Sequence, residues 1–246
     1  MACFVVAHGA WSAGWAWKKM HPLMRAAGHE LWTPTYTGLG ERAHLVSPSV
    51  GLDTHIEDVL GVMTFEDLRD VVLIGHSYGG MVATGVADRA RERISRLVYL
   101  DAFVPRDGES LFDLVGPAGR ARMQELARTE GNGWLVPSNP IPPDTSEADV
   151  AWITPLRLPQ PLKTFASPIR LASAETSLPR SYIYCQRFGP GDPFRKFADR
   201  AKSERGWQSY EIDASHSPHI TAPFALRDLL IVIAGAAGTA AGQAAQ

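Results

Sequence analysis

A serine lies at the centre of a Gly-x-Ser-x-Gly motif, in the segment Gly75-His76-Ser77-Tyr78-Gly79-Gly80. The motif alone is weak evidence because its residues are common, but here an apolar run at 71–74 precedes it and a helical pattern follows it. In this strand-turn-helix context the serine stands exposed on a sharp turn, and glycines are needed because neighbouring backbone crowds that turn. The sequence therefore predicts that Ser77 is a nucleophile for acyl transfer.

A serine hydroxyl needs an imidazole to accept its proton at neutral pH. Of the eight histidines, His216 lies in a loop between the last predicted strand and the closing helix. The carboxyl end of that strand should lie beside the nucleophile turn. His219 is a competing candidate, but it falls nearer the start of the helix. We predict that His216 is the general base and that His76, inside the motif, is turned away.

Two aspartates could orient His216. Asp101 directly follows the predicted strand 97–100, while Asp192 precedes a helix that it could cap. Either could instead be a turn aspartate that bonds to local backbone. At this point both Asp101 and Asp192 are candidates for the triad acid.

An oxyanion hole requires two aligned N–H donors. The residue after the nucleophile supplies one, which makes the backbone N–H of Tyr78 the first donor. The loop His8-Gly9-Ala10-Trp11 follows an early predicted strand, and its glycine permits close approach of the backbone. We predict Ala10 as the second donor and a structural role for His8.

The elements that must position these residues alternate between short β-rich runs and helical patterns. Predicted strands cover residues 4–6, 31–33, 71–74, 97–100, 182–185 and 207–212. Such alternation is typical of a mostly parallel, doubly wound α/β sheet. Thr54 and Glu57 have capping-box spacing at the start of one helix, and Pro223 and Gly235 bracket a closing helix.

The pattern changes between residues 104 and 179. The stretch 136–168 holds eight prolines, which a regular sheet could not accommodate. Long insertions are usually functional, and the apolar residues of this one need a surface to cover. We predict a core of 1–103 and 180–235, a cap of 104–179 over the site, and a flexible tail of 236–246. The alternative is a surface insertion without a role in function.

Charge, cysteine spacing and apolar segments exclude several classes of protein. The 246 residues carry 24 basic and 26 acidic side chains, a net charge of -2, without the basic stripe that nucleic acid or anionic membranes require. Cys3 and Cys185 lack metal-site spacing and are expected to be small buried thiols. The run 2–7 lacks a basic leader and a cleavage site, so we predict a strand there rather than a signal peptide, and the apolar run 229–234 is too short to span a bilayer. These features predict a cytoplasmic protein, and leave a homodimer open.

The loop 8–11, the turn 75–80 and the His216 loop together resemble the α/β-hydrolase family. More narrowly, the chain resembles the branch that holds plant methyl-ester esterases, hydroxynitrile lyases and bacterial hydrolases of esters, amides and carbamates. The resemblance extends from Phe4 to about Ile233. It is specific in the core and weak in the predicted cap. Segments 35–45 and 99–105 are most similar to the bacterial relatives, including carbendazim-type carbamate hydrolases.

The resemblance implies a carboxylesterase- or amidase-like serine hydrolase for a small, rather apolar substrate, with no metal or cofactor. The esterase branch carries its acid shortly after a cysteine similar to Cys185, where this chain has Gln186, Arg187 and Phe188. Haloalkane dehalogenases and some lipases of this fold carry theirs at the position of Asp101, so the resemblance favours Asp101 as the triad acid, with Asp192 as the alternative. A haloalkane dehalogenase itself would need an aspartate as nucleophile, which Ser77 excludes.

Two alternatives remain. The lyases of this branch have threonine in place of Gly9 and lysine in place of Ser217, so both departures favour hydrolysis. A ligand receptor on the hydrolase fold stays open because the acid is missing from its usual place.

Overall fold

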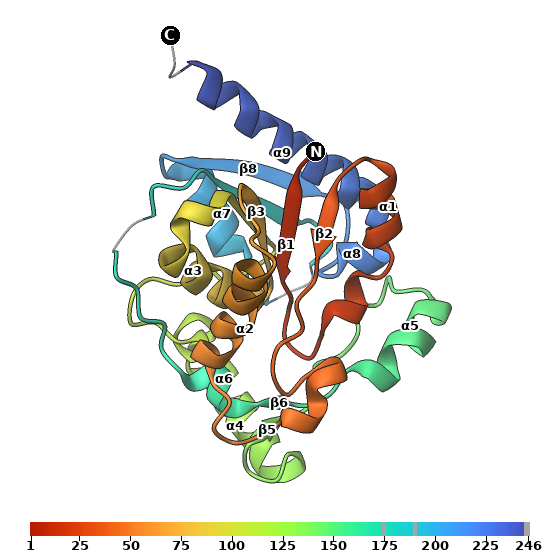
Figure 1. Ribbon diagram of the computed structural model, residues 1–246. Coiled ribbons are helices and arrows are strands. Elements are labelled where there is room, and N and C mark those ends of the chain that lie inside the picture. Colours follow the sequence, from red (N-terminus) through yellow and green to blue (C-terminus); the bar gives the residue numbers. More distant parts are fainter. Residues whose placement is uncertain (174–175, 189–190, 244–246) are drawn as a thin grey trace.

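The computed structural model describes residues 1–173, 176–188 and 191–243 (Figure 1). Its central sheet has six parallel strands in the order β2-β1-β3-β4-β7-β8. The strands are β1 Cys3–Ala7, β2 Glu30–Trp32, β3 Val71–His76, β4 Ile94–Leu100, β7 Arg180–Cys185 and β8 Trp207–Ile212. Each predicted strand overlaps one of these six, so the α/β prediction is confirmed.

Helices cover both faces of the sheet (Figure 1). One face packs against α2 (Leu52–Phe65), α3 (Gly79–Arg89) and α7 (Arg195–Ser203), and the other against α1 (Met20–Ala26) and α9 (Pro223–Gln243). Every residue of β3 is buried. This two-sided burial explains why the strands read as continuous apolar runs rather than as alternating patterns. Short helices complete the core: η1 Gly14–Trp17, η2 Gly40–Leu45, η3 Arg91–Arg93 and α8 Pro218–Thr221.

The strand order changes direction at β1, which lies between β2 and β3. Ala7 pairs with Gly75 and His76 pairs with Leu100, so β1, β3 and β4 end side by side. In open parallel sheets, ligands bind outside the carboxyl ends of the strands at such a switch point. The topology therefore brings the loop after β1, the Ser77 turn and Asp101 to one edge.

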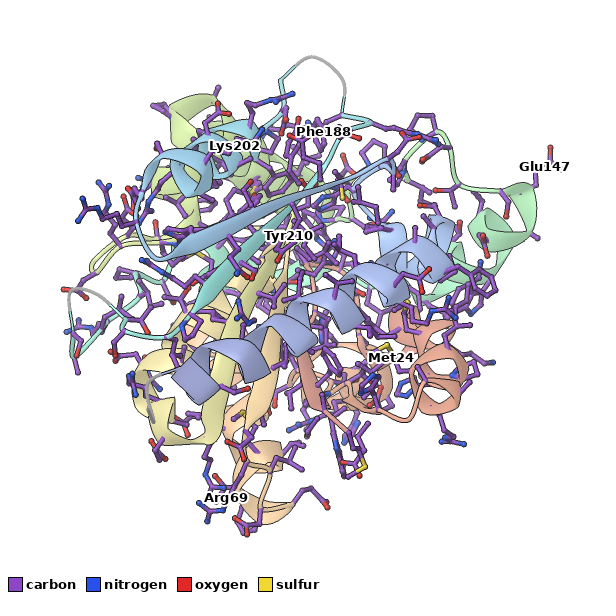
Figure 2. The ribbon with its side chains drawn as sticks, turned by 90° about the horizontal axis from the view of Figure 1, so that it is seen from above. Met24, Arg69, Glu147, Phe188, Lys202 and Tyr210 are labelled. Atoms are coloured by element: carbon purple, nitrogen blue, oxygen red, sulfur yellow. The ribbon has the colours of Figure 1, made fainter. Side chains whose placement is uncertain are left out.

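In the chain, the segment 104–179, the cap segment, falls between β4 and β7, and its helices and strands lie at this edge (Figure 1). It contains α4 Leu111–Glu130, β5 Leu135–Val136, α5 Glu147–Ile153, η4 Thr154–Leu156, β6 Gln160–Pro161 and α6 Leu162–Ala166. Strands β5 and β6 form an antiparallel ribbon. Glu147 marks the outer end of α5, away from the sheet (Figure 2). The sequence did not predict α4, which is interrupted by Gly116 (φ 75°) and Pro117.

Two predicted helix ends were wrong. Helix α2 begins earlier, with Gly51 as its N-cap, and the Thr54 hydroxyl accepts the Gly51 N–H at 3.3 Å. Helix α9 continues beyond Gly235, which does not adopt positive φ, through an alanine-rich stretch to Gln243. The first part of the predicted tail is therefore helical, and residues 244–246 lie outside the described residues.

The two cysteines are free thiols, with Cys185 buried and Cys3 half-buried. Burial, together with the nearby Glu30 carboxylate, raises the pKa of the Cys3 thiol to about 11. Within the part of the chain that the structure describes, no helix combines the length and hydropathy needed to cross a membrane.

Candidate active site

Ser77 occupies a left-handed turn between β3 and α3, with φ 56°. Its N–H donates to the Leu100 carbonyl at 3.3 Å, and its carbonyl accepts the Phe103 N–H at 3.2 Å. A side chain at Gly79 would collide with the Ala7 carbonyl, and one at Gly80 with the Phe103 carbonyl. These contacts explain why the turn needs glycines and why it holds a non-glycine residue at positive φ.

His216 is held by the carboxylate of Asp101. Its Nδ1 lies 2.7 Å from Asp101 Oδ2, and the other carboxylate oxygen accepts the Cys185 N–H at 3.2 Å. Asp101 is fully buried, and burial raises the pKa of its carboxyl, while the bond to His216 acts in the opposite direction. The bond between Asp101 and Nδ1 leaves Nε2 of His216 as the nitrogen that can exchange a proton with a nucleophile.

Asp192, the alternative acid, has other partners. Its Oδ1 accepts the N–H groups of Phe194 at 2.7 Å and Arg195 at 3.3 Å, which caps the start of α7. Its Oδ2 accepts the Tyr184 hydroxyl at 2.6 Å. The structure thus brings Asp101, and not Asp192, to His216.

Aromatic side chains fix the orientation of His216. Phe194 stacks on its ring at 4.7 Å between centroids, and Nε2 of His76 donates to the His216 carbonyl at 2.8 Å. The expectation that His76 turns away was therefore wrong. His219, the competing base, is buried and stacks on Trp17 at 4.6 Å. Burial, reinforced by His216, lowers the pKa of His219 to about 3.

The predicted oxyanion donors lie on two anchored segments. Among the described residues, no acceptor engages the N–H of Ala10 or Tyr78. His8 accepts the Tyr36 N–H at 3.3 Å, and its carbonyl accepts the Tyr36 hydroxyl at 3.0 Å, so it anchors the loop. The Tyr78 hydroxyl bonds to His55 Nδ1 at 3.0 Å, which anchors the nucleophile turn. Burial lowers the pKa of His8 to about 4 and that of His55 to about 3.

The cap segment bonds directly to the loop after β1. Gln160, fully buried in β6, accepts the Trp11 N–H at 3.0 Å, and the Val136 carbonyl accepts the Trp11 indole N–H at 2.8 Å. Trp11 itself has φ 54°. Sequence reasoning missed Gln160, because nothing in a proline-rich stretch marks a buried glutamine as a partner of a loop 149 residues away.

A cavity of about 300 Å³ lies between the core and the cap segment, and Ser77, His216 and Ala10 line it. Its walls are largely apolar and include Trp15 and Phe188; Figure 2 labels Phe188 in the loop after β7. Within the described residues, no group of three or more His, Cys, Asp or Glu side chains could hold a metal ion. The arrangement brings a serine hydroxyl and an imidazole to one cavity, with a carboxylate bound to the imidazole from behind.

Comparisons with known proteins identify the family of this chain. A family model described as alpha/beta hydrolase family matches residues 4–229. The carbendazim hydrolyzing esterase of Nocardioides sp. is 39% identical over 244 residues, which cover 95% of this chain and all of that protein. The alpha-hydroxynitrile lyase of Arabidopsis thaliana is 28% identical over 103 residues, covering 42% of this chain and 40% of the lyase.

Among solved structures, an extracellular alpha/beta-hydrolase from a Paenibacillus species superimposes with a TM-score of 0.80 at 26% identity. The match covers 94% of this chain and 98% of that one, and its description reports structural and functional homology to tobacco salicylic acid binding protein 2. The family match at residues 4–229 extends over the core strands, the turn at Ser77 and the cap segment alike. The chain therefore belongs to the α/β-hydrolase family and is a hydrolase related to esterases.

Proposed function

We propose that the protein is a serine hydrolase that cleaves small esters or carbamates through an acyl-enzyme on Ser77. The observation that carries this proposal is the bond between His216 Nδ1 and the buried Asp101, at the cavity that Ser77 also lines. A carboxylate on Nδ1 fixes the tautomer in which Nε2 can take the serine proton. The same steps could cleave an amide, which is a less reactive substrate than an ester.

In the proposed reaction, the Ser77 hydroxyl attacks the carbonyl carbon while His216 Nε2 takes its proton. The N–H groups of Ala10 and Tyr78 stabilise the negative oxygen of the tetrahedral intermediate. His216 then returns the proton to the leaving oxygen or nitrogen, and the bond to the leaving group breaks. His216 then deprotonates a water molecule, which attacks the acyl carbon. The bond from this carbon to Ser77 Oγ breaks, His216 returns the proton to Ser77 and the acid leaves, while Asp101 stabilises the imidazolium in both halves of the reaction.

The cavity limits the substrate. Its volume of about 300 Å³ is at the small end for ligand pockets, and its apolar walls favour aromatic or short aliphatic groups. The relative that aligns over its full length has a name that specifies carbendazim hydrolysis. This similarity favours small aromatic carbamates and esters as the substrate class.

The two rival functions have less support. A β-carbon at Gly9 would lie 2.9 Å from Nδ1 of His76 and 3.2 Å from Cβ of Ser77, so the threonine of the resembling lyases does not fit this turn without a shift. A ligand receptor was suggested by a missing acid, but Asp101 supplies a carboxylate to His216.

The Ser77→Ala substitution tests the nucleophile. We expect hydrolysis of 4-nitrophenyl acetate to fall by about 10⁴-fold or more, because no other group can form the acyl-enzyme. Ser49→Ala is the control, since Ser49 is exposed and outside the cavity. Turnover by Ser77→Ala at the rate of the control would refute the assignment. A panel of esters, carbamates, amides and a cyanohydrin then identifies the reaction, and activity on the cyanohydrin alone would overturn hydrolysis.

A further inference from the structure

The charged side chains that line the cavity are all positive. Arg157 and Arg187 line it, whereas no Asp or Glu of the described chain does. Arg187 has partners outside the cavity: its guanidinium bonds to the Asp213 carboxylate at 2.7 and 2.9 Å, and Asp144 lies 3.9 Å away. The positive charge of Arg187 is therefore balanced by carboxylates of the protein itself.

Arg157 differs from Arg187 in having no carboxylate within salt-bridge distance among the described residues. It lies directly after η4, and its two terminal nitrogens donate to the Asn139 carbonyl at 2.7 Å and to the Asn139 side-chain oxygen at 2.6 Å. Burial lowers the pKa of this guanidinium, which nevertheless remains charged at neutral pH. A partly buried cation without a counter-charge is unfavourable, so its position requires an explanation.

Asn139 uses two of the five N–H groups of the guanidinium and fixes its plane. The remaining donors can bind an anion, and a planar guanidinium held in place matches a carboxylate. No carboxylate from the described residues competes for it at the cavity wall. The cap segment thus presents a pre-oriented cation to whatever occupies the cavity.

We propose that Arg157, oriented by Asn139, binds a carboxylate carried by the substrate at a distance from the scissile carbonyl, so that the preferred substrates are monoanionic ester acids such as half-esters of dicarboxylic acids. This inference rests on the proposed function, because it assigns specificity to the same cavity. The apolar walls would contact the body of such a substrate, and Arg157 would neutralise its single charge.

Matched pairs of esters test the inference. In each pair, a terminal methyl is replaced by a carboxylate of similar size: 4-nitrophenyl butyrate with mono-4-nitrophenyl succinate, valerate with glutarate, and hexanoate with adipate. We expect kcat/KM of at least one anionic ester to exceed that of its partner by about tenfold or more, since a charge-assisted bond has that value. Arg157→Met should reduce the ratio to about one or below, and Arg157→Lys should retain part of it.

Two variants separate charge from structure. Asn139→Ala removes one bond to Arg157 but keeps the cation, so the preference should weaken without vanishing. Arg187→Met removes the other arginine of the cavity and should leave the ratio near its wild-type value. Near-ultraviolet circular dichroism and thermal melting verify that each variant is folded. The inference is wrong if no anionic ester is preferred, or if Arg187→Met rather than Arg157→Met removes the preference.

A binding measurement tests the carboxylate site independently of whether the protein hydrolyses esters. N-phenylglutaramic acid and valeranilide form a matched pair of amides, and calorimetry with Ser77→Ala measures their binding without turnover. Tighter binding of the acid, lost with Ser77→Ala/Arg157→Met, supports the carboxylate site even if no ester is hydrolysed by the wild type. Hydrolysis of esters combined with equal binding of both amides would instead retain the hydrolase and reject the site.

Discussion

At the scale of single residues, the site gathers backbone that is strained. Six non-glycine residues of the described chain have positive φ, and three of them, Trp11, Ser77 and Asp101, belong to the site. Each such residue costs on the order of 1–3 kcal/mol and persists only where its surroundings hold it. In this fold the cap ribbon holds Trp11, the strand ends hold Ser77, and the Ile183 carbonyl, which accepts the Asp101 N–H at 2.7 Å, holds Asp101.

The choice between the two aspartates is testable by matched substitutions. Asp101→Asn should lower kcat for 4-nitrophenyl acetate by about 10³- to 10⁴-fold, because an amide disfavours the required tautomer and cannot stabilise the imidazolium. Asp192→Asn should change kcat little, since asparagine also caps helices well. Steady-state kinetics of both variants at one pH decide the matter. A collapse of kcat in Asp192→Asn alone would transfer the role of acid to Asp192.

Single residues also show what the sequence can predict. Ser77, His216 and Asp101 each follow a strand, and strands of a parallel sheet end at one edge, so chain order predicts that they lie close together. The choice of Asp101 over Asp192 needs the family resemblance as well. The positions of Arg157 and Gln160 could not be predicted, because their partners lie across loops without periodicity. Likewise, the bond of His76 to the His216 carbonyl depends on how a loop closes after β8.

At the scale of elements, the strands were predictable because burial on both faces gives each one a continuous apolar run. Helix α4 was not, since Gly116 and Pro117 interrupt its pattern after the first turn and indicate a break. The cap ribbon of β5 and β6 has only two residues in each strand, too few for any periodic signal. Its position against the loop after β1 depends on side-chain bonds instead.

We expect this ribbon to set the geometry of the oxyanion hole. Gln160→Met keeps the size of the side chain but leaves the Trp11 N–H without its acceptor, so the adjoining Ala10 amide should lose its alignment. A displaced oxyanion donor should lower kcat about tenfold or more with a smaller change in KM. The unpaired N–H should also lower the free energy of unfolding by about 1–3 kcal/mol. Steady-state kinetics and urea unfolding measure the two effects.

Thr164→Val is the control for Gln160→Met. It removes the bond from Gln160 Nε2 to the Thr164 hydroxyl at 2.8 Å and the bond from that hydroxyl to the Pro161 carbonyl at 2.7 Å, but leaves the bond between Gln160 and Trp11. Affinity for a trifluoromethyl ketone, whose adduct places a negative oxygen in the hole, should fall in Gln160→Met much more than in Thr164→Val. Equal losses in both variants would show that Gln160 serves only the packing of the cap.

At the scale of the whole molecule, four of the eight histidines are buried: His8, His55, His76 and His219. Burial is the main cause that lowers each pKa, to about 4 for His8, about 3 for His55 and His219, and well below the usual value for His76. All four are therefore neutral in the native protein near pH 5, where the same histidines of an unfolded chain, with a pKa of about 6.5, are protonated.

This difference should make the fold sensitive to mild acid. Below about pH 6.5 the unfolded state binds more protons than the native state, so the free energy of unfolding falls as the pH falls towards 4. Each buried histidine contributes at most about 1.4 kcal/mol per pH unit. Asp101 acts in the opposite direction near pH 4, because burial raises the pKa of its carboxyl in the native state, but it is one group against four. Urea unfolding between pH 7.5 and 5.0 measures the slope.

His55→Gln tests whether buried histidines cause that slope. Glutamine can still bond to the Tyr78 hydroxyl and the Thr37 carbonyl, which contact the two ring nitrogens of His55, but it does not titrate. We expect the slope to decrease by about one proton, which is about 1.4 kcal/mol per pH unit between pH 6 and 5. His44→Gln, which replaces an exposed histidine outside the cavity, is the matched control. If both variants keep the wild-type slope, the acid sensitivity originates in other groups. If His55→Gln alone reduces the slope, the buried neutral histidine that anchors the turn at Ser77 also makes the fold sensitive to acid.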